Sequence, residues 1–382
     1  NYDKTGGVSD MATLKEISEL TGYSIATISR VLNHDVSLSV TDGTREEILR
    51  VAGKLDYESK SVRSSRKKAA QLRVGIIEMM DSQMKLEDPY YLYLKSSLDK
   101  CCFEEGFETV TLQFDEEENC YKSNSQSGLN GIIAVGQFGA EQIHAMEQWT
   151  NQIIFLDSSP YEDRFSSVVP NFQVGIQQGV NYLAEMGHKT MAFVGPVMST
   201  DSMGSDAPEK RRKIFMEYMN YYRKDLKAVF IDTDRESSDV LEKTGAYLRE
   251  EEHPATAFFA FNEAAAIGVM QAVQQMGYRV PEDFSILSYN DTVLATLMQP
   301  QLSSISIHLE EMAQEAVKLL RRGMVESGVP PMKIAIPSSL SERESVKRIP
   351  REDLPPTEDA EQCEGKSQAD RQEKTEKIEN TQ

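Results

Sequence analysis

The chain has 382 residues, of which 40% are hydrophobic, so it is long enough to bury two or three globular cores. Its formal net charge of −20 excludes a protein that coats nucleic acid over its whole surface, so any DNA binding must be local. No apolar run approaches the 18 or so residues that span a bilayer, and residues 1–10 lack the apolar stretch of a signal peptide, so we expect a cytoplasmic protein without membrane contact.

Residues 13–33 carry the pattern of a helix-turn-helix. Thr13 followed by Glu16 forms a capping box that predicts a helix start, and Gly22 permits the turn after this helix. Ser24 supplies a second N-cap, after which apolar residues recur at helical spacing. Such a unit places its second helix in the DNA major groove, although an ordinary helical hairpin of a core would share the pattern.

The outward positions of this second helix suit contact with DNA. They are small, hydroxylated or cationic: Ala26, Thr27, Ser29 and Arg30. Arg30 could donate to O6 and N7 of a guanine. A third helix is predicted from Thr44, where TREE forms another capping box, and its apolar residues would close a core with Ile17, Leu20 and Val31. A run of basic residues follows between residues 54 and 73. It indicates either a segment that contacts DNA phosphates or a solvated linker.

From residue 72 onward, short apolar strands alternate with amphipathic helices. We predict strands at 74–79, 109–114, 131–135, 153–157, 191–194, 228–231, 257–261 and 285–289. We predict helices near 90–105, 140–149, 173–187, 208–223, 237–252, 263–277 and 308–323. Repeated strand-helix units predict parallel sheets, and two sets predict two doubly wound lobes with a ligand between them, at the carboxyl ends of the strands.

Polar and aromatic residues follow several of these strands and suit a hydroxylated ligand. They are Asp88, Tyr90, Tyr91, Asn262, Asn290 and Asp291. Carboxylates and amides can pair with vicinal hydroxyls of a sugar, while aromatic rings cover its apolar face. Helix capping after a strand is the alternative interpretation, above all for Asp88 and Asn290.

Catalytic and metal-binding patterns are missing from the sequence. Cys101, Cys102, Cys120 and Cys363 show no zinc or disulfide spacing, and the sequence contains no HExxH or GxSxG motif and no Walker loop. We therefore expect neither an enzyme nor a cofactor, and we assign no catalytic or metal-ligating residue. A sugar-acting enzyme would need a general acid/base pair, and an exported sugar-binding protein would not carry residues 11–68.

The segment MATLKEISELTGYSIATISRVLN, followed in order by GHKTMAFVGP, AFFAFNEAAAIG, VPEDFSILSYND and PQLSSI, resembles the LacI/GalR family of transcriptional regulators over residues 11–348. The resemblance implies an all-α helix-turn-helix headpiece and an α/β two-lobed, periplasmic-binding-protein-like domain. It also implies base contacts from Ile25, Ala26 and Arg30. Backbone contacts or helix support are implied for Ser24, Thr27, Ser29 and Asn33.

The same resemblance implies how the chain is controlled. The effector-binding positions fall on Arg211, with Arg212 as the alternative, on Asn262 and on Asn290. The likeness is closest to galactose and β-galactoside regulators, which implies a repressor of such an operon with a galactose-type sugar as effector. Another sugar, a purine or a phosphoprotein corepressor is the alternative.

The segment after the headpiece departs from the family pattern. Ser59, Lys60, Arg63 and Arg66 stand where the family has proline, asparagine, alanine and the leucine that wedges into the minor groove. An arginine cannot act as an apolar wedge, so we expect Lys60, Arg63 and Arg66 to add salt-dependent backbone affinity instead of the leucine kink.

The family likeness also sets the expected assembly, a homodimer or a tetramer on palindromic operator DNA, paired near residues 89–102 and 304–320. The predicted domains are an N-terminal extension (1–10), the DNA-binding domain (11–58), a hinge (59–71), the effector-binding and dimerisation domain (72–348) and a disordered acidic tail (349–382). Within 72–348 we place the N-lobe at about 72–170 and 304–328, and the C-lobe at about 171–303 and 329–348.

Overall fold

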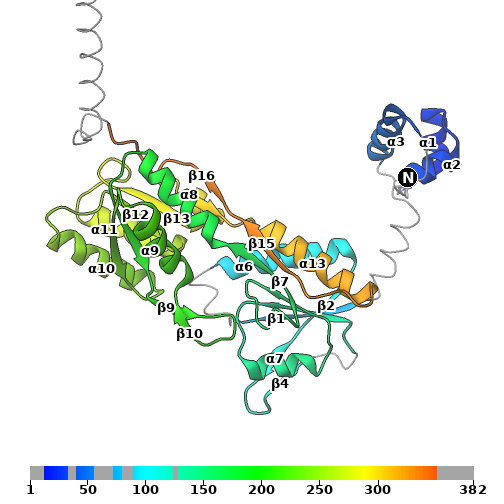
Figure 1. Cartoon of the computed structure of the whole chain (residues 1–382), viewed down its shortest axis with the longest axis horizontal. Helices are drawn as coiled ribbons and strands as arrows, with labels where there is room; N and C mark the ends of the chain where they lie inside the picture. Colours follow the sequence, from blue (N-terminus) through cyan, green and yellow to red (C-terminus); the bar gives the residue numbers. More distant parts are fainter. Residues whose placement is uncertain (1–12, 33–39, 56–71, 80–88, 124–127, 351–382) are drawn as a thin grey trace, which may run out of the picture.

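The computed structural model describes residues 13–32, 40–55, 72–79, 89–123 and 128–350 (Figure 1). Three expectations lie outside these residues: the structure of the N-terminal extension, of the hinge at 59–71 and of the acidic tail from 351 onward. No helix within the described ranges is long and apolar enough to cross a membrane.

The N-terminal unit consists of three short helices: α1 (Leu14–Thr21), α2 (Ile25–Leu32) and α3 (Asp42–Lys54). Both halves of the predicted capping box form at the start of α1, since Glu16 N donates to Thr13 Oγ1 and Thr13 N donates to the Glu16 carboxylate. Gly22 ends α1 with a φ of 74°, in the left-handed region that glycine adopts without steric cost. The helix-turn-helix prediction is therefore confirmed.

The structure of this unit differs from the expected one in one core residue and in the start of its third helix. Its core contains Ile17, Ile28, Val31, Ile48, Val51 and Ala52. Leu20 was predicted to join it but is 64% exposed, because it lies on the outer side of α1. The third helix begins at residue 42, because Thr41 accepts from Thr44 N and caps it; the predicted start at Thr44 was wrong.

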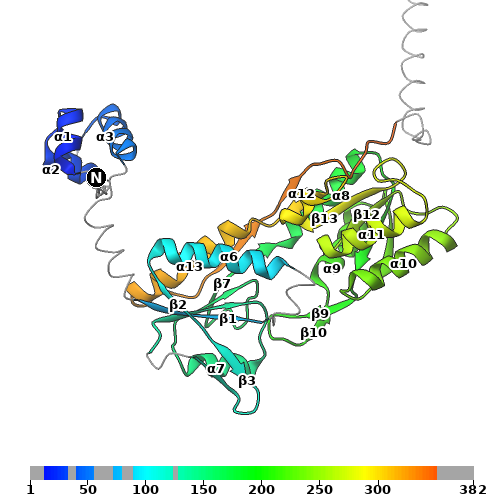
Figure 2. The ribbon, with the colours of Figure 1, turned by 180° about the vertical axis from the view of Figure 1, so that it is seen from behind.

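The other described residues form two lobes, each built on a six-stranded sheet (Figures 1 and 2). The first sheet has the order β15-β7-β6-β5-β1-β2 and is parallel throughout. Its lobe contains β1 (Arg73–Glu78), α6 (Tyr90–Glu105), β2 (Glu108–Thr111), β3 (Gln113–Asp115), β4 (Cys120–Lys122), β5 (Gly131–Val135), α7 (Ala140–Glu147), β6 (Ile153–Leu156), β7 (Ser166–Asn171), α13 (Leu309–Val325) and β15 (Lys333–Pro337), of which β3 and β4 form a separate two-stranded sheet.

The second sheet has the order β11-β8-β12-β13-β14-β16, parallel except for its last pair. Its lobe contains α8 (Phe172–Glu185), β8 (Thr190–Gly195), β9 (Met198–Thr200), β10 (Asp206–Pro208), α9 (Lys210–Tyr222), β11 (Lys227–Asp232), α10 (Ser237–Glu250), β12 (Ala257–Ala260), α11 (Glu263–Gln275), β13 (Ser285–Asn290), α12 (Val293–Leu297), β14 (Ser303–Ser306) and β16 (Ser339–Ser341). The predicted fold, two doubly wound lobes behind a helix-turn-helix, is confirmed.

The chain passes between the lobes three times: from β7 into α8, from β14 into α13, and from β15 into β16. The crossings are tied together, because Ser338 Oγ donates to the carbonyl of Asn171 at 3.3 Å and Ser339 Oγ lies 2.9 Å from His308 Nε2. One expected boundary was wrong. β15 was placed in the second lobe, but it pairs with β7 in the first sheet.

Candidate functional site

The second helix of the helix-turn-helix, α2, presents the polar and exposed face expected of a DNA-reading helix. It buries Ile28 and Val31 against the other helices. Ile25 is 47% exposed, and Ala26 and Arg30 are also exposed. The residues named from the family pattern for base contact therefore share the solvent side of the helix.

Ser24 and Thr27 support the start of this helix, and Ser29 lies partly exposed within it. Ser24 Oγ accepts from Thr27 N at 3.1 Å, which makes Ser24 the N-cap of α2. The turn before it is held because Ser18 Oγ donates to the carbonyl of Tyr23 at 2.6 Å, and Tyr23 OH donates to Glu47 at 3.3 Å. Asn33, Lys60, Arg63 and Arg66 lie outside the described residues.

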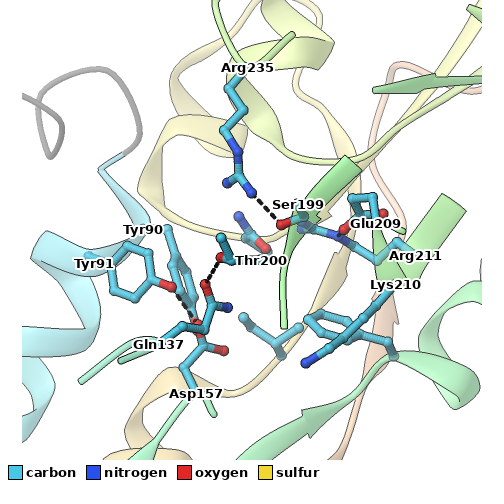
Figure 3. A pocket seen from close by; sticks show the side chains of 13 residues that line it. Tyr90, Tyr91, Gln137, Asp157, Ser199, Thr200, Glu209, Lys210, Arg211 and Arg235 are labelled. Atoms are coloured by element: carbon cyan, nitrogen blue, oxygen red, sulfur yellow. Dashed lines mark hydrogen bonds and ion pairs between the residues drawn. The ribbon is translucent and has the colours of Figure 1, made fainter. Parts of the chain in front are cut away.

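A pocket lies between the two lobes (Figure 3). Two of its lining residues, Phe172 and Ile307, lie at chain crossings. Its empty space, counted with its open mouth, is about 620 Å³. Its lining residues come from both lobes: Tyr90, Tyr91, Gln137, Asp157, Phe172, Ser199, Thr200, Glu209, Lys210, Arg211, Arg235, Asn290 and Ile307.

The wall from the first lobe is centred on a carboxylate. Asp157 follows β6 with a φ of 74°, a left-handed conformation that is unusual for a residue other than glycine. Tyr91 OH donates to Asp157 Oδ2 at 2.7 Å, and the ring of Tyr90 packs edge-on against Tyr91 with centroids 4.7 Å apart. Burial raises the pKa of the Asp157 carboxyl, while the hydrogen bond from Tyr91 opposes that rise.

The wall from the second lobe is centred on an arginine. Arg211 Nε donates to Glu209 Oε1 at 2.8 Å, and its Nη1 donates to the carbonyl of Phe261 at 2.7 Å. The rings of Phe172, Phe261 and Tyr289 lie 5.0–5.7 Å from its guanidinium carbon. This packing fixes the plane of the guanidinium, and burial raises the pKa of Tyr289 to about 12, so its phenol stays neutral.

The structure distinguishes Arg211 from its neighbour Arg212. Arg212 Nη2 pairs with Asp232 Oδ1 at 2.9 Å and its guanidinium lies over the ring of Phe230, so it belongs to the outer side of the lobe. Glu209 accepts from Arg212 N at 2.7 Å and thereby caps α9. Arg211, the first choice from the sequence, is therefore the arginine that lines the pocket.

The β9–β10 hairpin of the second lobe reaches across to the first lobe. Thr200 Oγ1 donates to Gln137 Oε1 at 2.7 Å, and Ser159 N donates to Ser202 Oγ at 3.1 Å. Gly204 has a φ of 72° and packs against the backbone of Gly139, where a Cβ on Gly204 would lie 3.1 Å from Gly139 N. These contacts hold the two lobes together over the pocket.

Four of the predicted effector-binding residues line the pocket: Tyr90, Tyr91, Arg211 and Asn290. Two others do not. Asn262 accepts from Ala265 N at 2.9 Å and caps α11, and Asp291 pairs with Arg343 at 2.7 Å and accepts from Ser341 Oγ at 2.6 Å. The capping alternative therefore applies to Asn262, whereas Thr292 caps the helix after Asn290. Asp88 lies outside the described residues.

Other lining residues were not predicted from the sequence, above all Gln137, Asp157 and Arg235. Asp157 follows a predicted strand, so the strand-end rule that selected Asn262 and Asn290 could also have selected it. Gln137 likewise follows β5. Across the described ranges, no cluster of histidine, cysteine, aspartate or glutamate could hold a metal ion.

A polar pocket between two lobes, carried by the same chain as a helix-turn-helix, is typical of a ligand-controlled DNA-binding protein. Models of known families agree with both parts: residues 13–59 match "Bacterial regulatory proteins, lacI family", and residues 180–346 match "Periplasmic binding protein-like domain".

Comparison with individual proteins identifies the family. The chain is 30% identical over 350 residues to the HTH-type transcriptional regulator GalR of Streptococcus thermophilus, which covers 88% of this chain and 100% of the relative. The chain belongs to the lacI family of bacterial regulatory proteins. It is a DNA-binding transcriptional regulator, and its relatives are regulators and not enzymes.

Two solved structures show the same fold at low sequence identity. A lac repressor dimer bound to operator and the anti-inducer ONPF superposes with a TM-score of 0.56 at 22% identity, covering 88% of this chain and 99% of that chain. A complex of the transcriptional regulator CelR with cellobiose gives a TM-score of 0.58 at 19% identity, covering 87% and 99%.

Proposed function

We propose that the chain is a repressor that binds operator DNA through α2 and releases it when a small sugar, of galactose type, occupies the interlobe pocket. The proposal is supported above all by Asp157 and Arg211, which line one pocket from opposite lobes. Asp157 contributes a carboxylate and Arg211 a planar guanidinium. Both groups match vicinal hydroxyls, and the rings of Tyr90 and Phe172 offer apolar faces beside them.

The proposed assembly is a homodimer, or a tetramer, on a palindromic operator, because one recognition helix reads only a short half-site. We propose that the headpiece comprises residues 11–58 and the hinge 59–71, with Ile25, Ala26 and Arg30 contacting bases. Ser24, Thr27, Ser29 and Asn33 would contact the backbone or support the helix, and Lys60, Arg63 and Arg66 would contact phosphates. Since its target is bacterial DNA, we place the protein in the cytoplasm.

The coupling follows from the position of the pocket. A sugar held by Asp157 on one lobe and Arg211 on the other favours the arrangement in which the lobes lie together. The change in arrangement alters the spacing of the two headpieces of a dimer. The sugar can shift the equilibrium between the two arrangements by no more free energy than the difference between its binding free energies for them. The three crossings are the segments about which the lobes would move.

The test is fluorescence anisotropy of the full chain on its own upstream DNA, at two salt concentrations, with galactose, lactose or a purine added. Tight, salt-dependent binding that a galactoside relieves is the expected result. If the chain binds the DNA tightly but no sugar changes the affinity, it is still a DNA-binding regulator, and the proposal of a sugar effector is wrong. If only the purine releases the DNA, the effector is a purine.

A further inference from the structure

The pocket contains more positive than negative charge. Its charged lining residues are Asp157, Glu209, Lys210, Arg211 and Arg235, three cations against two carboxylates. Glu209 and Arg211 form an ion pair at 2.8 Å with little exposure, so these two charges neutralise each other. The charge of Lys210 acts on Asp157, and its effect lowers the pKa of that carboxyl against the stronger effect of burial. Arg235 is the third cation of the pocket, and neither of the two carboxylates of the lining is assigned to it.

Arg235 is placed to receive an anion. It follows β11 in the second lobe, and within the described part of the chain no carboxylate lies at ion-pair distance from it. Its Nη2 donates to Ser199 Oγ at 2.5 Å, which uses one of its five N–H donors. The hydroxyl hydrogen of Ser199 remains able to donate. Arg235 and Ser199 together therefore present a charged fork and a hydroxyl to the pocket.

The two ends of the pocket differ in chemistry (Figure 3). Arg235 and Ser199 lie at one side, whereas Asp157, with the hydroxyl of Tyr91 bonded to it, lies at the other. A carboxylate accepts from sugar hydroxyls and repels a phosphate, and a guanidinium binds a phosphate through two parallel hydrogen bonds. A ligand that satisfies both ends carries hydroxyls at one end and an anionic group at the other.

We infer that the effector is a phosphorylated sugar, with its hydroxyls on the Asp157 side of the pocket and its phosphate at Arg235 and Ser199. This inference rests on the proposed function, a sugar-controlled regulator, and names the chemical class of the sugar. Arg235 is then a specificity-determining residue, because it separates a phosphorylated sugar from the neutral parent sugar.

The experiment is isothermal titration of the full chain with galactose, galactose 6-phosphate and inorganic phosphate. Galactose 6-phosphate is expected to bind at least 10-fold more tightly than galactose, and inorganic phosphate only weakly, because a charge-assisted fork strengthens binding by about 10- to 100-fold. In Arg235→Gln the advantage of the phosphorylated sugar should fall by 10-fold or more, while galactose affinity changes much less. Arg279→Gln is the matched control, since Arg279 is an exposed arginine of the same lobe that pairs with Asp283.

Equal or tighter binding of galactose would overturn the inference and leave the sugar-controlled regulator standing. Equal loss of both sugars in Arg235→Gln would also overturn it, because Arg235 would then act on the pocket as a whole. Inorganic phosphate that binds as tightly as galactose 6-phosphate would overturn it as well, since the sugar would add nothing. If none of the sugars binds while a purine does, the proposed function itself fails.

Discussion

The contact between Ser202 and Ser159 offers a direct test of how the lobes are held together. Ser202→Ala removes the Oγ that accepts from Ser159 N across the interlobe gap at 3.1 Å. Ser202 does not line the pocket that contains Asp157 and Arg211, so the change leaves the proposed sugar contacts in place. Any effect on sugar binding must then come through the arrangement of the lobes.

The size of the effect follows from one hydrogen bond. A net contribution of about 0.5–1.5 kcal/mol corresponds to a fall of about 2- to 12-fold in the ratio of closed to open molecules. If the sugar binds the closed arrangement, its apparent Kd rises by up to the same factor. Isothermal titration with the sugar that binds the wild-type chain measures this shift.

Ser205→Ala is the matched control for this experiment. Ser205 lies in the same hairpin and is exposed, and no side-chain hydrogen bond of Ser205 is present in the described part of the chain. The control should bind sugar and unfold as the wild type does, and Ser202→Ala should unfold within a few degrees of the wild-type temperature. Identical sugar affinity in Ser202→Ala and Ser205→Ala would refute the idea that the hairpin contact stabilises the closed arrangement.

Three further predictions concern the headpiece, the core and pH. Arg30→Ala should weaken specific operator binding by about 1–3 kcal/mol and relax the preference at one base pair, whereas unchanged specificity in a binding-site selection would remove Arg30 from base contact. Gly175→Ala should lower the free energy of unfolding by about 1–3 kcal/mol, because its Cβ would clash with the buried hydroxyl of Tyr289 and lie 2.8 Å from Ile305 Cγ2. The control is Gly245→Ala, whose Cβ would meet only the end of Arg249 at 3.4 Å. This control should unfold near the wild-type temperature. Burial lowers the pKa of His188, whose Nδ1 lies 2.9 Å from Thr256 Oγ1, to about 4. The unfolded chain then binds the proton more readily, so stability should fall as the pH drops from about 6.5 to 4, by about 3 kcal/mol in total, and His188→Gln should flatten that dependence in chemical denaturation.

The predicted strands with continuous apolar runs agree with the structure because their burial on both faces leaves a local signal. The strand at 131–135 has the predicted bounds, and those beginning at 153, 257 and 285 agree within one residue at each end. β7 (Ser166–Asn171) was missed: it contains two serines and ends near Pro170, which cannot donate to a ladder. Its pairing with β15 joins residues far apart in the sequence.

Part of the pocket lining could be predicted from the sequence. Tyr90, Tyr91 and Asn290 follow elements that local patterns identify. Asn262 and Asn290 both stand at the end of a predicted strand. Asn262 caps a helix, whereas Asn290 lines the pocket. Asn262 is followed directly by a helix, whereas the helix after Asn290 begins only at Val293 and is capped by Thr292. Arg235 contacts Ser199, which lies in the β9–β10 hairpin. No local sequence pattern predicts where this hairpin lies.

We propose that sugar bound between the lobes controls DNA binding by the headpiece. The most direct measurement is operator binding by anisotropy for the wild-type chain and for Arg211→Met, each titrated with the effector sugar. We predict equal operator affinity without sugar, release of the wild type by sugar, and retention of the variant on DNA at the same sugar concentration. Release of both proteins at the same concentration would contradict the claim, because the sugar would then act somewhere other than the pocket lined by Arg211.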